Sequence, residues 1–109
     1  MHMASEAIVV FMTTSNREEA VRLGDMLVGS HLAACVQILP EIESIYRWQG
    51  KIEISAEILI LVKTTRDKFA DLEKQVKAIH SYETPEIIAV PASDISEPYL
   101  KWLNESIVL

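Results

Sequence analysis

Only a few side chains in this chain could ligate a metal ion, and His80 is the foremost of them. The sequence contains three histidines and one cysteine. His80 follows an apolar helical stripe, so we expect it at a helix C-terminus, where the helix dipole favours the protonated ring and opposes metal binding. Two roles are open at this position: a helix cap beside Tyr82, which is the favoured interpretation, and a metal ligand or other polar site residue.

The other candidate ligands, His31 and Cys35, are expected to serve the fold. Cys35 is surrounded by Ala33, Ala34 and Val36, whereas a reactive thiol requires electropositive and partly exposed surroundings. His31 lies just before a predicted strand, where a capping or surface role is favoured over a ligand role. A single cysteine cannot form a disulfide within the chain, so the pattern is not that of a disulfide-stapled secreted domain.

Three charged side chains of a predicted β-hairpin, together with Tyr82 before the last predicted strand, are candidate site residues. Glu57 and Lys63 share one strand face, with Leu59 and Leu61 between them, and buried charges require partners. We therefore predict a polar pocket at a junction between subunits, lined by Lys63, Glu57, Lys51 and Tyr82. Two roles remain open for this pocket: binding of a small anion, and ion pairing across the interface.

Three aromatic side chains are predicted to lie at an interface between subunits. Tyr46 and Trp48 share a strand face near the hairpin tip, and an exposed tryptophan there requires a surface to pack against. Trp102, on the last predicted helix, is assigned the same role. No GxSxG, HExxH, P-loop or CxxC pattern occurs in the sequence, so the protein is predicted not to be an enzyme.

The elements that must position these residues are predicted from the hydrophobic pattern. Apolar or alternating runs predict strands at 7–13, 33–39 continuing past Pro40 over 42–48, 52–62 and 87–90. Candidate N-caps for three helices are Ser15, Thr64 or Thr65, and Ser96. The stripes expected to be buried are Ala20, Leu23, Leu27 and Val28 in the first helix and Phe69, Leu72, Val76 and Ile79 in the second.

The predicted order of elements is β-α-β-β-α-β-α, an α+β fold. Two split β-α-β units in series give a ferredoxin-like four-stranded antiparallel sheet, with two helices on one face and an extra C-terminal helix. A turn at 49–51 with Gly50 closes a hairpin that extends out of the domain, where it would grip neighbouring subunits. One domain is expected over residues 4–109, and residues 1–3 are interpreted as an expression remnant followed by the native start.

The composition disfavours several classes of partner. Sixteen acidic residues against ten basic ones give a net charge of −6, which is unsuited to nucleic acid or to an anionic membrane. No stretch approaches the ~20 apolar residues that cross a bilayer, and no secretory signal is recognised before the first strand. We therefore expect a cytoplasmic location.

Five motifs form a combination that is more specific than any of them alone. They are AAC at 33–35, SIYRWQGKIE at 44–53, ILVKTT at 60–65, HSYETPEIIAVP at 80–91 and YLKWLNESI at 99–107. Over essentially the whole chain, this combination resembles CutA, the divalent-cation tolerance family. The resemblance implies a ferredoxin-like homotrimer, similar in architecture to PII signalling proteins, whose long hairpins wrap onto adjacent subunits. It also implies tolerance to copper and other divalent cations.

The metal ligands implied by this resemblance are incompletely present. The family's first-strand cysteine corresponds to Met12, and its adjacent pair of histidines corresponds to Ile79 and His80. A thioether is a soft ligand suited to Cu(I), so Met12 and His80 would hold copper or another divalent cation only weakly. We therefore predict a trimeric metal-responsive binding protein, with an unidentified protein partner left open. The alternatives are a PII-like signalling trimer that binds a small anion in the inter-subunit cleft, and a scaffold trimer without a ligand.

Overall fold

A computed structural model describes residues 5–108 of the chain. The predicted expression remnant at residues 1–3 lies outside the described residues. The elements are β1 (Ala7–Thr14), α1 (Arg17–Gly29), β2 (Cys35–Trp48), β3 (Lys51–Thr65), a 3₁₀ turn (Arg66–Lys68), α2 (Phe69–Ile79), β4 (Ile87–Pro91) and α3 (Glu97–Ser106). Their order is the one that the hydrophobic pattern predicted.

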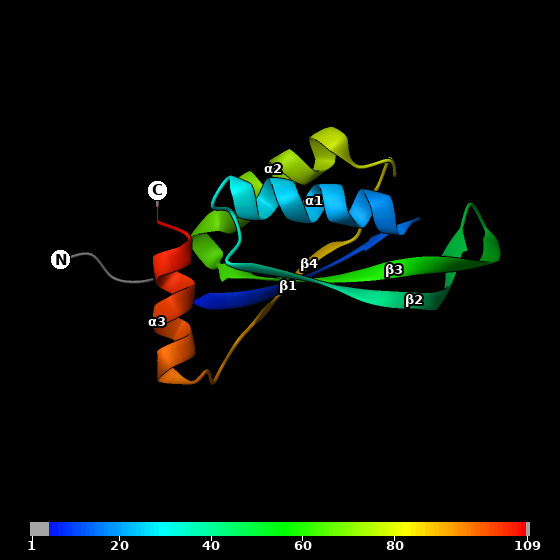
Figure 1. The fold of residues 1–109 in the computed structure, drawn as a ribbon. Coiled ribbons are helices and arrows are strands. Elements are labelled where there is room, and N and C mark those ends of the chain that lie inside the picture. Colours follow the sequence, from blue (N-terminus) through cyan, green and yellow to red (C-terminus); the bar gives the residue numbers. More distant parts are fainter. Residues whose placement is uncertain (1–4, 109) are drawn as a thin grey trace.

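The four strands form one antiparallel sheet in the order β2-β3-β1-β4. Helices α1 and α2 lie side by side on one face of the sheet, and α3 stands at the end opposite the hairpin tip (Figure 1). Each crossover joins two strands that flank one other strand: the connection through α1 passes over β3, and the connection through α2 passes over β1, as the split β-α-β arrangement requires. The predicted ferredoxin-like fold with an extra C-terminal helix is therefore confirmed.

The hydrophobic core fills the space between the sheet and the two helices. Alternate residues of β1 and β3 point toward the helices, as expected for period-two strands with one covered face. The core side chains are almost completely buried and comprise Ile8, Val10, Met12, Ala20, Leu23, Leu27, Ile60, Val62, Leu72 and Val76.

In both α1 and α2 the stripe of buried side chains ends earlier than the sequence predicted. Val28 and Ile79 were expected in the core, but each lies in the last turn of its helix, where they are 44% and 51% exposed. The N-cap of α1 is Asn16 rather than Ser15: Asn16 is extended, and its Oδ1 accepts a hydrogen bond of 2.8 Å from the Glu19 amide.

The other face of the sheet is open. It carries the side chains that alternate with the core set, namely Val9, Phe11, Leu59, Leu61, Ile88 and Val90. The prediction that 87–90 is a buried strand was wrong, because β4 is an edge strand whose Ile88 and Val90 are 54% and 45% exposed on this open face. Only one end of this face is covered, where Leu103 and Ile107 pack with Ala7.

The β2–β3 hairpin extends well beyond the rest of the sheet, as Figure 1 shows. β1 pairs with β3 only as far as Ile58, so the hairpin beyond that residue has no third strand. It turns at Gln49 and Gly50, whose φ angles of 50° and 78° fit the two-residue turns that match strand twist. The predicted irregularity at Pro40 is present as a register shift between Ile38 and Glu41.

Candidate functional site

A hollow of about 540 Å³ lies between the hairpin and the segment that joins α2 to β4. We call it the hairpin hollow. Its walls come from β1, β2, β3 and the α2–β4 segment, and they carry three glutamates and three aromatic rings. The lining residues are Thr13, Ser44, Ile45, Tyr46, Trp48, Glu57, Tyr82, Glu83, Thr84 and Glu86.

Glu57 and Tyr82 meet inside the hairpin hollow. The Tyr82 hydroxyl donates a hydrogen bond of 2.8 Å to Glu57 Oε2, and Glu57 is only 8% exposed. Burial, together with this bond to a carboxylate, raises the pKa of Tyr82 well above its usual value of 10.0. The phenol therefore stays protonated at neutral pH and remains a hydrogen-bond donor.

The electrostatic character of the hollow is negative. Burial raises the pKa of Glu86, and the negative charge of Glu57 raises it further. Glu83 adds a third carboxylate to the lining, and among the lining residues that the structure describes none is basic. Within one subunit the hollow therefore suits a positively charged group and is poorly suited to an anion.

Two buried side chains anchor the α2–β4 segment that forms one wall of the hollow. His80 Nε2 donates to the Thr13 carbonyl at 2.9 Å, and its Nδ1 accepts from the Tyr82 amide at 2.9 Å, which fixes the neutral Nε2–H tautomer. The Glu19 carboxylate accepts from the Ser81 amide at 2.7 Å and from the Ser81 hydroxyl at 2.9 Å. These bonds hold Tyr82 in place against the end of β1.

The environment of His80 fits a structural role better than a metal-ligand role. Its side chain is completely buried and both ring nitrogens are engaged, so a metal ion would have to displace one of these hydrogen bonds. Met12 is also fully buried, within the core between sheet and helices. Across residues 5–108, no three His, Cys, Asp or Glu side chains are grouped so that they could hold a metal ion.

The four residues predicted to share a polar pocket do not all meet within one subunit. Glu57 and Tyr82 are in contact, but the Lys63 ammonium donates to Gln37 Oε1 on the open face of the sheet, and Lys51 is paired with Trp48 at the hairpin tip. The predicted pocket therefore needs a neighbouring subunit to supply its lysines. It stays a prediction.

The aromatic residues predicted at an interface are all partly exposed. Tyr46 is 41% and Trp48 is 47% exposed, both line the hairpin hollow, and Tyr46 Oη lies 2.9 Å from Ser55 Oγ. Trp102 is 44% exposed, and its ring centroid is 5.3 Å from that of Tyr99. These exposures leave room for a partner subunit at each position.

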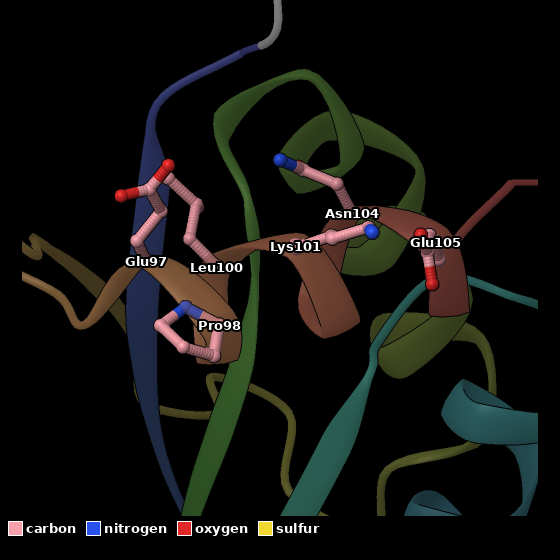
Figure 2. A pocket seen from close by; sticks show the side chains of 6 residues that line it. All are labelled: Glu97, Pro98, Leu100, Lys101, Asn104 and Glu105. Carbon is pink, nitrogen blue, oxygen red and sulfur yellow. The ribbon is translucent and has the colours of Figure 1, made fainter.

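A second hollow, of about 660 Å³, lies along α3. Figure 2 shows the side chains that line it, and Pro98 and Leu100 provide its apolar floor. The carboxylate of Glu97, at the first turn of the helix, and that of Glu105, at the last, lie at opposite ends of the labelled set (Figure 2). All lining residues come from this one helix, so no two elements converge to make a site here.

The sequence predicted fold-serving roles for His31 and Cys35, and these roles stay predictions. His31 adopts the left-handed region with φ of 62°, and its Nδ1 lies 3.3 Å from the Ser106 carbonyl, so it links the end of α1 to α3. Cys35 is half-buried at the start of β2.

The site residues that sequence reasoning missed include Thr13, Glu19, Glu83 and Glu86. The two later glutamates lie within one of the motifs that carried the resemblance, but nothing in their spacing indicated that both line the same hollow as Glu57. Glu19 lies in the first turn of α1, a position where the helix dipole alone would favour an acidic residue. Its 2% exposure, in contrast, shows a buried carboxylate with a specific partner.

Comparison with known proteins identifies the family. The model of the family described as CutA1 divalent ion tolerance protein matches residues 8–106. The chain belongs to this family. The resemblance stated from the motifs is therefore confirmed.

Individual CutA relatives match nearly the whole chain. A divalent-cation tolerance protein CutA of Thermus thermophilus is 46% identical over 98 residues, which are 90% of this chain and 95% of that protein. A chloroplastic CutA protein of Arabidopsis thaliana is 43% identical over 92% of this chain, which spans only 55% of that protein. The solved structure of a periplasmic CutA from Archaeoglobus fulgidus has a TM-score of 0.91 at 39% identity and covers 94% of this chain and 99% of that one.

These names do not agree on a cellular location. One relative is called chloroplastic and another periplasmic, so the expected cytoplasmic location of this chain stays a prediction. Within residues 5–108, no helix has the length and apolar character needed to cross a membrane.

Proposed function

We propose that the protein is a homotrimeric binding protein of divalent-cation tolerance and that it has no catalytic activity. The observation that carries the tolerance role is the family match over residues 8–106, which covers all elements of the fold except the first residue of β1. The absence of catalytic activity is supported by the sequence, which contains none of the catalytic motifs considered above.

The proposed assembly is supported by apolar surface that one chain leaves uncovered. Phe11, Leu59 and Leu61 form the middle of the open sheet face, and the hairpin adds Ile45, Ile52 and Ile54, which are 65%, 68% and 63% exposed. The two groups lie on opposite faces of β3, and exposed apolar patches of this kind mark interfaces between proteins. Because both faces of the hairpin carry exposed large side chains, a partner on one side alone would leave the other side open, which favours a closed ring of copies.

For the metal, we propose that copper or another divalent cation is bound only weakly. The ligands implied by the family resemblance are Met12 and His80, and both are fully buried here. Binding at His80 would cost a hydrogen bond to Thr13 or to Tyr82. A weak site is therefore what these side chains favour.

The test is a calorimetric titration of the metal-stripped protein with Cu²⁺ and Zn²⁺. The protein should lack residues 1–3, because an N-terminal amine beside His2 could bind copper on its own. We expect saturable, weak binding of at least one cation. No saturable heat with either cation would contradict the binding role, whereas tight binding that is lost on His80→Gln would place the metal at His80 after all.

The alternative of a small anionic ligand depends on the neighbouring subunit. The hollow within one subunit has three carboxylates and no basic residue among its described lining, so Lys51 or Lys63 of another copy would have to supply the positive charge. Titration with ATP under the same conditions tests this alternative, and heat from ATP without heat from metal would favour it. Heat from neither would favour the third alternative, a scaffold trimer without a ligand.

A further inference from the structure

We infer that the hairpin hollow binds a positively charged organic group, an ammonium or a guanidinium, supplied by a small organic cation or by a lysine or arginine side chain of a second copy of this chain. Its volume of about 540 Å³ is in the range of small-molecule sites. The ligand class goes beyond the proposed function, and only the second source rests on the proposed homotrimer.

The observation that carries this inference is a buried carboxylate without a countercharge. Glu57 is more than nine-tenths buried, at 8% exposure, and it faces the hollow. Its donor is the neutral hydroxyl of Tyr82, and none of the ion pairs among residues 5–108 includes Glu57. Because buried charges in proteins are paired, the site is missing a cation.

Two further carboxylates in the hollow strengthen the case for a bound cation. Glu83 and Glu86 line the same space, and neither forms an ion pair within the described residues. The negative charge of Glu57 contributes to raising the pKa of Glu86, which is the repulsion that a bound cation would relieve. Three carboxylates around one hollow thus favour a cationic occupant over a neutral one.

The aromatic walls specify an organic cation. Tyr46, Trp48 and Tyr82 all line the hollow, and aromatic faces attract ammonium and guanidinium groups. Two of these rings are held in place, Tyr82 by Glu57 and Tyr46 by the contact of its hydroxyl with Ser55. Trp48 is 47% exposed, so its ring is available to an incoming group.

A bare metal ion fits this hollow less well. Metal ions need several ligand atoms at about 2–2.6 Å, and no three acidic, histidine or cysteine side chains within residues 5–108 are close enough together to provide them. An ammonium or guanidinium on an apolar stem is larger, so it can reach separated carboxylates while its stem lies against the rings. The geometry therefore favours an organic cation.

The first arm of the test titrates the whole protein with spermidine, which carries ammonium groups, and with agmatine, which carries a guanidinium. Calorimetry is combined with fluorescence in a Trp102→Phe background, in which Trp48 is the remaining tryptophan. We expect saturable binding of at least one probe with a change in Trp48 emission. Glu57→Gln should weaken binding by about tenfold or more, because it removes the buried charge and keeps the size of the side chain.

The matched control is Glu43→Gln. Glu43 is exposed on the neighbouring strand β2 and on the opposite face of the hairpin, so this variant removes the same charge without touching the hollow. Binding in the control should be unchanged. Equal weakening in both variants would mean attraction to the net negative surface only, and that result would overturn a site for a free cation.

The second arm distinguishes a lysine or arginine of another copy from a free cation. If the source is a second copy, neither probe binds, and Glu57→Gln weakens the assembly in sedimentation equilibrium by about tenfold while Glu43→Gln does not. A double-mutant cycle with Lys51→Gln and Lys63→Gln should then couple Glu57 to one lysine. If neither probe binds and Glu57→Gln leaves the assembly unchanged, the inference is overturned. A monomeric wild-type chain would contradict the proposed homotrimer instead, and the first arm alone would then decide the ligand.

Discussion

The replacement His80→Ala separates a structural histidine from a metal-binding one. The His80 ring is completely buried and makes two hydrogen bonds, to the Thr13 carbonyl and from the Tyr82 amide. Each bond contributes about 1 kcal/mol, and removing the ring leaves a cavity and two unpaired backbone groups. We therefore expect a loss of about 3 kcal/mol in the free energy of unfolding, which for a domain of this size lowers the Tm by roughly 10–15 °C.

The measurement is urea and thermal unfolding in the presence of a chelator, at one fixed protomer concentration because assembly makes stability depend on concentration. The loss should be the same with and without chelator. If metal-free His80→Ala is as stable as the wild type to within about 0.5 kcal/mol, the hydrogen bonds of His80 are not stabilising and the structural role assigned here is wrong.

The matched control is His31→Asn. His31 is partly exposed, has a single longer contact of 3.3 Å, and occupies the left-handed region with φ of 62°, which asparagine tolerates. We expect a change of less than about 1 kcal/mol for this variant. A loss as large as that of His80→Ala would show that any histidine replacement disturbs the fold, and the comparison would then carry no information on the role of His80.

Three further predictions concern the hairpin turn and the hollow. Gly50→Ala should lower the free energy of unfolding by about 1 kcal/mol, because Gly50 has a φ of +78° that alanine adopts at a cost; an unchanged Tm would contradict this. In the wild type the pKa of Tyr82 is raised, so the unfolded chain loses the phenol proton at lower pH than the folded one, and the free energy of unfolding should fall as pH rises above 10.0. Urea unfolding below and above that pH measures this fall, and Tyr82→Phe should remove it. Burial and then the charge of Glu57 raise the pKa of Glu86 above 4.5, so its contribution to stability is lost as pH rises through its folded-state value. Glu86→Gln should therefore gain stability relative to the wild type between acid and neutral pH, and parallel pH profiles of the two proteins would refute the raised pKa.

Most of the fold could be predicted from the sequence because local patterns decide it. The alternation along β3 fixed which side chains face the helices, and Gly50 indicated the turn. The errors fall where tertiary position overrides the local pattern. Val28 and Ile79 continue a helical stripe into the last turn of each helix, where both are exposed, and Ile88 is apolar although the helices cover the other face of the sheet.

The candidate site could be predicted only in part. Glu57 and Lys63 do share a strand face, but six residues of strand span about 20 Å, so within one subunit they cannot line one pocket. The partner of Glu57 is Tyr82, which is 25 residues away in the sequence. Glu19 reaches Ser81 across 62 residues, and contacts between such distant segments leave no periodic signal.

Sedimentation equilibrium of the wild-type protein measures directly whether three copies of the chain assemble. One chain has a mass of 12.3 kDa, and the proposed homotrimer predicts three times that value over a range of protein concentrations. A single species with the mass of one chain would contradict the account, because the open sheet face and both faces of the hairpin would then remain uncovered in solution.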